Sequence, residues 1–324
     1  MVNIYKVGIR ICIVLITLLF VACARKPLPV LETGAQNPMP DAWIDSDTGH
    51  RIKKLVMDGG SNRSFYFHNN PFVPGDRTNP DQMIYYRTLE NQPPQLYALD
   101  LKTGASKKLT NQSRVSGEIV AKKGRKVYYQ CRDSVFETTI DQAQTRLVYV
   151  FPDSLRGSIT TLNADETLLA GAIVSPEERE LYRKNPQKRD YFNLIYEAGL
   201  ERSLFTLSVD SGELNVFYSE NAWLNHIQFS PVDPHLLMYC HEGPWHKVDR
   251  IWTIDVQQGI PRLMHRRTVD REIAGHEFFS PDGQRIWFDL QIPRSETFYL
   301  SSVDVATGEV LRYGLTRNEW SVHF

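Results

Sequence analysis

The sequence has little cysteine, almost no net charge and only one long apolar run. Four of the 324 residues are cysteine, and Cys12 and Cys23 both precede the body of the chain. Cys131 and Cys240 lie far apart inside strand-like runs, so we expect them to be free and buried rather than joined in a disulfide. The 37 basic and 38 acidic side chains leave a formal net charge of −1. That balance lacks the basic excess of a nucleic-acid-binding protein, and we predict no such partner.

The apolar run Ile11–Ala22 follows Lys6 and Arg10 and precedes Cys23. It is too short to span a membrane comfortably, whereas a basic start and a short apolar core are typical of a secretory signal. Phe20–Cys23 resembles a bacterial lipobox, which implies cleavage before Cys23 and lipidation of its thiol. The alternative is a plain signal peptide with an unrelated cysteine.

We therefore predict a lipoprotein-type signal peptide over residues 1–22 and a proline-containing tether over 23–40, followed by one folded domain over 41–324. The predicted location is the periplasm or cell envelope, with the protein tethered to a membrane by lipid.

Short segments rich in β-branched and aromatic residues alternate with turn signals along the folded domain, which predicts an all-β chain. The turns contain Asp, Thr and Gly, which suit tight hairpins. The expected strands include Phe65–Phe67, Met83–Tyr86, Leu96–Leu99, Lys126–Tyr129, Leu204–Leu207, Arg250–Ile254 and Arg285–Phe288.

One pattern returns at a fixed distance. His226 lies four residues before Ser230, and His276 lies four residues before Ser280, 50 residues further on; His323 follows after another 47. A repeat of this length is typical of the blades of a β-propeller. Blade-like units begin near residues 64, 115, 157, 222 and 272, with a sixth interrupted at the last residue.

The stretch that begins at Ser175 breaks the strand pattern. Ser175 is a suitable N-cap, Pro176 suits the first helical position, and acidic residues follow. We predict a helix inserted into the third blade and running towards Glu197. Such an insertion either shapes a binding site or is a decoration of the surface.

Several longer motifs together resemble the oligogalacturonate lyases, which are pectin-degrading, seven-bladed β-propellers. The resemblance runs from about residue 43 to the end and implies a seven-bladed propeller whose last blade is incomplete in this chain. It further implies β-elimination on oligogalacturonide substrates with Mn²⁺ or another divalent metal. The motifs that carry it are Trp43–His50, Ser64–Asn70, Glu220–His226, Tyr239–His246 and Gly275–Gly283.

The resemblance also suggests roles for single residues. His226 is expected to be the catalytic base and Arg202 to bind the substrate carboxylate, while His276 matches a metal ligand. His241 is an alternative base or a partner that positions the base. His68 and His246 are expected in the substrate pocket, His246 with exposure to solvent as the plain alternative.

Members of the family take a glutamine and two more histidines of the metal site from a final blade. No such stretch is present here, so the resemblance implies a C-terminally truncated chain with weak manganese binding and little activity. The runner-up is a non-enzymatic periplasmic propeller lipoprotein that binds glycans or proteins. A peptidase-associated propeller is disfavoured because no Gly-x-Ser-x-Gly motif follows the blades. The sequence does not determine the oligomeric state.

The lipobox can be tested by replacing Cys23 with Ala. We expect the variant to be released from the membrane fraction or to remain unprocessed, because the lipid would have no thiol to join. Cell fractionation followed by immunoblotting measures both outcomes, and membrane attachment equal to that of the parent would contradict the prediction.

Overall fold

A computed structural model describes residues 27–56 and 59–320 of the chain. Within these ranges the chain forms six β-sheets and two helices. It divides into two compact units, residues 1–58 and 59–324. Neither described helix is long and apolar enough to cross a membrane. The predicted signal peptide and Cys23 lie outside the described residues.

The first unit contains a three-stranded sheet of β1 (Val30–Leu31), β2 (Ala42–Asp45) and β3 (Arg51–Lys53). β1 pairs with β2 in parallel, so part of the predicted tether belongs to a sheet. The Asp45 carboxylate accepts hydrogen bonds from the side chains of Thr33, at 2.6 Å, and Thr48, at 2.8 Å. These bonds fix the segment after β1 against the end of β2.

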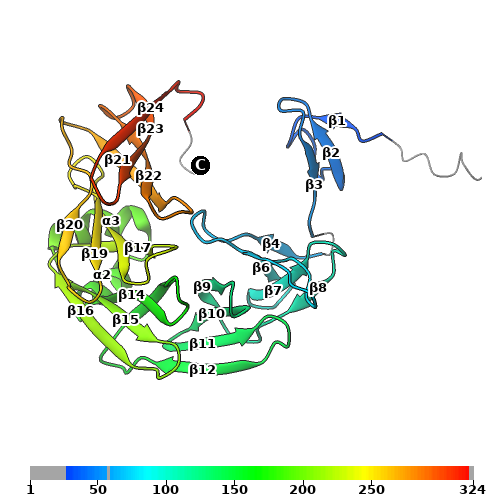
Figure 1. Cartoon of the computed structure of the whole chain (residues 1–324), viewed down its shortest axis with the longest axis horizontal. Helices are drawn as coiled ribbons and strands as arrows, with labels where there is room; N and C mark the ends of the chain where they lie inside the picture. The colour runs from blue at the N-terminus through cyan, green and yellow to red at the C-terminus, as the bar shows by residue number, and fades with distance from the viewer. Residues whose placement is uncertain (1–26, 57–58, 321–324) are drawn as a thin grey trace, which may run out of the picture. The chain divides into compact units, whose positions relative to one another are not determined.

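The second unit consists of five sheets in chain order (Figure 1). Each runs back and forth with antiparallel neighbours, as the blades of a propeller do. The first sheet contains β4 (Ser61–Arg63), β5 (Phe72–Val73), β6 (Gln82–Thr88), β7 (Gln95–Asp100) and β8 (Ser106–Lys108). The second contains β9 (Ser116–Ala121), β10 (Lys126–Cys131), β11 (Ser134–Thr139) and β12 (Thr145–Val150). The third contains β13 (Gly157–Leu162), β14 (Leu168–Val174), β15 (Arg202–Ser208) and β16 (Leu214–Glu220). The fourth contains β17 (Leu224–Phe229), β18 (Leu236–His241), β19 (Ile251–Asp255) and β20 (Pro261–Leu263). The fifth contains β21 (Ile273–Phe279), β22 (Arg285–Gln291), β23 (Phe298–Asp304) and β24 (Val310–Leu315).

The hydrophobic core lies between consecutive sheets. One cluster joins Tyr86 of the first sheet to Tyr129 of the second, and another joins Phe205 of the third sheet to residues of the second. Two further clusters join the third sheet to the fourth and the fourth to the fifth. Blades packed face to face in this way bury their apolar surface only through their neighbours, which confirms the predicted all-β propeller.

The number of blades differs from the expectation. The described residues form six sheets rather than a seven-bladed array with an incomplete last blade, and β21–β24 is a full four-stranded sheet. The predicted blade starts agree with the five sheets of the second unit. Phe65–Phe67, predicted as a strand, is a loop after β4. Phe65 packs against Tyr86 of its own blade, whereas Phe67 packs against His276 and Phe278 of the fifth blade. His323 lies outside the described residues.

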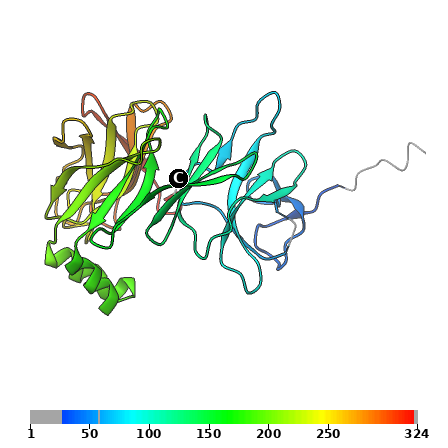
Figure 2. The same cartoon turned by 90° about the horizontal axis from the view of Figure 1, so that it is seen from below.

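The predicted inserted helix is two helices, α2 (Pro176–Lys184) and α3 (Lys188–Ala198), between β14 and β15. Ser175 is the N-cap and accepts a hydrogen bond from the Glu178 amide, as its sequence position predicted. The helix axis breaks at Asn185, where Pro186 follows, because the residue before a proline disfavours the helical conformation. Figure 2 shows both helices beyond one end of the sheets.

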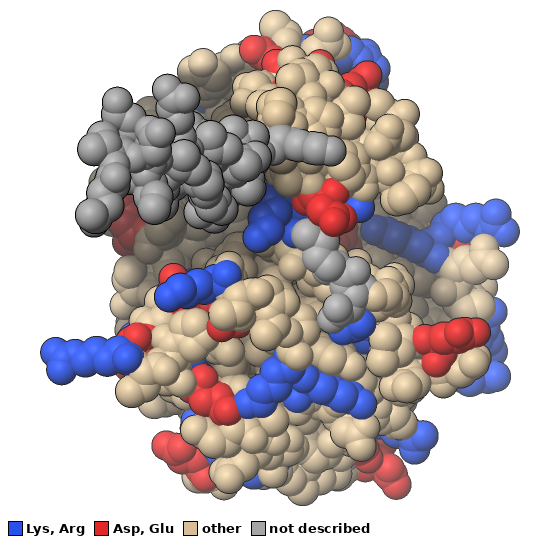
Figure 3. All heavy atoms as spheres, turned by 90° about the vertical axis from the view of Figure 1, so that its right-hand side faces the viewer, with Lys and Arg blue, Asp and Glu red and all other residues tan. Residues whose placement is uncertain are grey.

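Acidic and basic side chains are interspersed on the face shown in Figure 3. This mixture agrees with the formal net charge of −1. Neither observation indicates a basic surface for a nucleic acid.

Candidate active site

His226 and His276 occupy equivalent positions in two neighbouring blades. Each follows the first residue of a β-bulge in its blade's first strand, β17 or β21. Their φ angles are 46° and 53°, and Gly117 occupies the matching bulge of β9 with φ 65°. A residue other than glycine in this region costs on the order of 1–3 kcal/mol and often marks a functional position. A bulge also turns the side chain out of the regular alternation of the strand.

A buried ion triad lies beside these histidines. Arg250 donates from Nη1 to Glu242, at 3.0 Å, and from Nε to Glu277, at 2.9 Å. All three side chains are at most 7% exposed. Burial alone would raise the pKa of both carboxyls, but Arg250 and His226 outweigh it and hold both pKa values below their ordinary range. The three side chains are therefore charged. They connect the end of β18 and the start of β19 in the fourth blade to β21 in the fifth.

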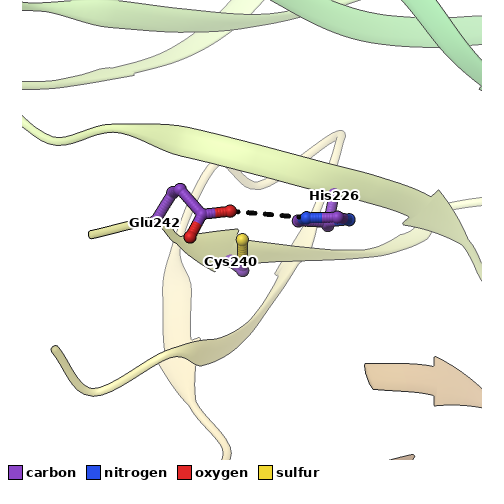
Figure 4. Close-up of side chains that lie close together, drawn as sticks. All are labelled: His226, Cys240 and Glu242. Carbon is purple, nitrogen blue, oxygen red and sulfur yellow. Dashed lines mark ion pairs between the residues drawn. The ribbon is translucent and has the colours of Figure 1, made fainter. Parts of the chain in front are cut away.

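Glu242 also contacts the predicted base. Its Oε2 lies 3.4 Å from Nε2 of His226, as Figure 4 shows. A carboxylate at this position favours a proton on Nε2 and leaves the lone pair on Nδ1. Nδ1 is then the atom that can accept a proton from a substrate. Arg250 and Asn225 bind the same carboxylate, so its orientation is fixed from several sides.

His226 and Arg202 line one cavity of about 360 Å³. The sequence placed both in the site, and the structure brings them to the same pocket. Trp223, which directly precedes β17, and Glu242 line another side of the cavity. The two inserted helices contribute Tyr182, Lys188, Tyr191 and Phe192.

Arg202 is engaged by the protein itself. Its Nε donates to Glu178 Oε2 at 2.8 Å, its Nη2 binds Glu178 and the Tyr182 hydroxyl, and its Nη1 donates to the Leu224 carbonyl at 2.8 Å. Of five N–H donors, these bonds leave one on Nη1. The family resemblance suggested that Arg202 binds the substrate carboxylate. In the structure, however, Arg202 has no pair of free N–H groups for a carboxylate. It instead anchors α2 to the start of β15.

His276 bonds to a buried carboxylate of its own blade. Its Nδ1 lies 2.6 Å from Asp289 Oδ1. Burial raises the pKa of Asp289, although His276 acts in the opposite direction. The ring of Trp245 meets the His276 ring edge-on at 5.5 Å between centroids. A histidine oriented by a carboxylate through one nitrogen is the usual arrangement of a metal ligand that binds through the other.

The loop after β4 reaches both histidines. The ring of His68 lies 6.5 Å from that of His226, and Tyr66 lies 5.9 Å from His226. Phe67 packs 6.1 Å from His276. His68 also borders a separate cavity of about 290 Å³ with residues of the second to fourth sheets. His68 therefore lies near His226 but lines a different cavity.

His241 and His246 lie elsewhere. His241 bonds to Glu220 at 3.0 Å and stacks on Trp252, with ring centroids 4.8 Å apart. It precedes Glu242 in the chain, so its side chain leaves the opposite face of the strand. His246 lines a different cavity, formed with α3.

The described residues offer two places for a metal. The only group of three potential ligands found among them is His226, Cys240 and Glu242, shown in Figure 4. This group fits manganese poorly, because Arg250 already neutralises Glu242 and burial raises the pKa of the Cys240 thiol. Cys131 and Cys240 are free and buried, as expected. His276 fits better as a ligand, because Asp289 orients its ring.

A family profile described as oligogalacturonate lyase matches residues 37–317. The chain belongs to the oligogalacturonate lyase family. The oligogalacturonide lyase of Pectobacterium atrosepticum is 24% identical over 282 residues, which cover 82% of this chain and 68% of that protein. The oligogalacturonate lyase of Dickeya dadantii is 25% identical with the same coverage. A solved oligogalacturonate lyase in complex with manganese has the same fold, with a TM-score of 0.74, 24% identity, and coverage of 85% of this chain and 72% of that one.

Several residues that build this oligogalacturonate-lyase-type site escaped the sequence analysis. Glu242 lies inside the most distinctive motif, and Glu277 directly follows His276. Alternation along the strands could have separated them from their histidine neighbours. Arg250, which binds both glutamates, had no local signal in the sequence. The same holds for Glu178, the partner of Arg202, and for Asp289, the partner of His276. The residues missed are Glu178, Glu242, Arg250, Glu277 and Asp289.

Replacing Arg250 with Met should destabilise the fold by about 3–5 kcal/mol at neutral pH, because two buried carboxylates lose their cation. In the parent, the lowered pKa values of Glu242 and Glu277 stabilise the fold above the unfolded value of about 4.3, and this contribution is lost as the pH falls. In the variant, burial raises the pKa of both carboxyls and His226 is the remaining group that opposes it.

The deficit of the variant should therefore be larger at pH 7 than at pH 5, which urea unfolding at both values measures. The exposed Arg317, replaced by Met, serves as the control, and we expect little change there. An Arg250→Met deficit that is the same at both pH values would contradict the role of the triad.

Proposed function

We propose that this chain is an oligogalacturonate lyase that cleaves short galacturonate chains by β-elimination. The observation that carries the proposal is His226, held in a left-handed bulge against Glu242 and opening on the pocket that Arg202 also lines. An imidazole that is oriented by a buried carboxylate is suited to general-base catalysis. Family membership supports the same reaction.

His226 Nδ1 removes the proton from C5 of the uronate, the carbon next to the carboxylate. The electron pair of the C5–H bond forms the double bond between C4 and C5. The C4–O4 bond breaks with its electrons on the leaving oxygen, which takes a proton from water. Glu242 stabilises the imidazolium that forms. Arg250 keeps the Glu242 carboxylate charged. When the imidazolium loses its proton, Glu242 therefore retains the proton on Nε2 and Nδ1 is again free to act as the base.

Negative charge builds up on the uronate carboxylate as the C5 proton is removed, and nearby cations stabilise it. Arg202 contributes its remaining Nη1 donor and the positive field of its guanidinium, although Glu178 balances part of that charge. Lys188, from the first turn of α3, lines the same pocket and adds an ammonium group. Preorganised cations at such a carboxylate lower the barrier to proton removal.

We further propose that the enzyme uses a divalent metal, with manganese favoured by the name of the solved relative. His276 would be one ligand, oriented by Asp289. When bound, the metal would offset negative charge on the substrate carboxylate. The second candidate function, a non-enzymatic propeller lipoprotein, is less favoured because His226 and its buried partner Glu242 line one pocket together with Arg202. The lipid anchor at Cys23 and a periplasmic or envelope location remain proposals that rest on the sequence of residues 1–23.

Replacing His226 with Asn should lower the turnover number by about 10²–10⁴, because the reaction loses its general base. The ultraviolet absorbance of unsaturated uronates, with digalacturonate and manganese present, measures turnover. His235→Asn is the control, since the His235 ring lies away from this pocket and bonds to Gln257 at 3.0 Å. Equal activity of His226→Asn and the parent would rule out His226 as the base.

Replacing Asp289 with Asn should weaken manganese binding about 10–100-fold, because the ligand His276 loses its orienting carboxylate. Replacing His276 with Ala should weaken it at least as much. Calorimetric titration with manganese alone measures both effects without any assay of activity. If neither variant changes the manganese affinity, the metal is bound by other residues.

A further inference from the structure

A second cavity shares a wall with the candidate active-site pocket. It measures about 450 Å³ and lies between α3 and the segment Gly243–His246, with Ile273 and Arg294 on the fifth-blade side. Lys188 and Phe192 line both cavities. A ligand longer than one sugar could therefore extend from one cavity into the other past these two side chains.

The charges that line this second cavity are all of one sign. The charged residues that line it are Lys188, Arg189 and Arg294, and no aspartate or glutamate does. Arg189 has a partner in its neighbour Asp190, at 3.4 Å. Lys188 and Arg294 have no ion pair among the described residues. In a chain with a net charge of −1, this is a local excess of positive charge that favours an anionic ligand.

The other walls are apolar and aromatic. Trp245 and Phe192 face the cavity from opposite elements, a loop and a helix. The indole of Trp245 is held in place by His276, edge-on at 5.5 Å, and by the Arg250 guanidinium, 5.8 Å from the ring centroid. Aromatic walls with a few charged groups are typical of small-molecule sites, and they suit the C–H surface of a sugar ring.

The cavity is built by packing between elements. Gly243 has φ 150°, and a Cβ atom there would lie 2.5 Å from the ring of Tyr196 on α3. The same atom would lie 3.1 Å from Val248. Only a glycine lets the loop approach the helix this closely, so this contact packs the loop on one side of the cavity against the helix on the other.

We propose that this cavity is a second uronate subsite, in which Arg294 and Lys188 bind the carboxylate of the sugar next to the one that reacts. Trp245 forms the apolar wall against that sugar. The inference rests on the proposed lyase function for its ligand class. It makes Arg294 a residue that recognises substrate without contact to the reacting atoms.

The test compares Arg294→Ala with the parent, both carrying His226→Asn so that the ligand is not consumed. Calorimetry with digalacturonate should show about tenfold or greater loss of affinity, because a charge-assisted hydrogen bond is removed. Arg294→Lys should retain part of the affinity, and Arg317→Ala, an exposed cation of the same blade, should retain all of it. With galactobiose, the same disaccharide without carboxylates, Arg294→Ala should bind as the parent does.

The subsite is overturned if Arg294→Ala and its parent bind digalacturonate with equal affinity. It is also overturned if Arg294→Ala weakens galactobiose binding as much as digalacturonate binding, or if the parent does not bind digalacturonate. In the background with His226 restored, Arg294→Ala should raise KM with little change in kcat. If digalacturonate binds and Arg294→Ala weakens it, but no unsaturated product forms, the lyase function fails while the subsite stands. If product forms and Arg294→Ala has no effect on affinity, the subsite alone fails.

Discussion

The triad of Glu242, Arg250 and Glu277 is the interaction on which the rest of the site depends. Arg250 binds Glu242 within the fourth blade and Glu277 of the fifth blade, so one charge-assisted hydrogen bond crosses between the blades in a region closed to solvent. A buried ion pair of this kind adds little net stability compared with apolar packing, but it is costly to break. Its value here is positional, because Glu242 orients His226 and the Glu277 backbone adjoins His276. The blade interface and the catalytic geometry are thus fixed by the same charges.

The repeat of blades was readable from the sequence because it has local signals. Aromatic strands, Asp-Thr-Gly turns and the His-to-Ser-Pro spacing each occupy a short stretch, and they predicted five sheet starts and both bulge histidines. The helix start at Ser175 followed from its N-cap in the same way. The number of sheets was wrong, since it came from the family resemblance rather than from the chain.

What the sequence could not supply are the contacts between blades. Arg250 and Glu277 are 27 residues apart and on different sheets, and no periodicity links them. The pairing of Arg202 with Glu178 similarly depends on how α2 folds back over β15. Phe65–Phe67 had the composition of a strand, but Tyr66 and Phe67 contact His226 and His276 of other blades instead. Tertiary packing overrides strand propensity at such positions.

The inserted helices convert a repetitive scaffold into a site with its own selectivity. α2 and α3 close one side of the pocket at His226, and α3 also forms the basic cavity beside Trp245. In the proposed lyase, the catalytic base would lie on a strand, while some of the groups that recognise the sugar chain would lie on the inserted helices.

The most direct test of the central claim is an isotope effect on the bond that His226 is proposed to break. Digalacturonate with deuterium at C5 should yield the unsaturated uronate more slowly than the unlabelled substrate, while deuterium elsewhere on the ring should not slow it. Cleavage that gives two saturated galacturonates, or no cleavage with manganese present, would contradict the assignment of this chain as a lyase with His226 as its base.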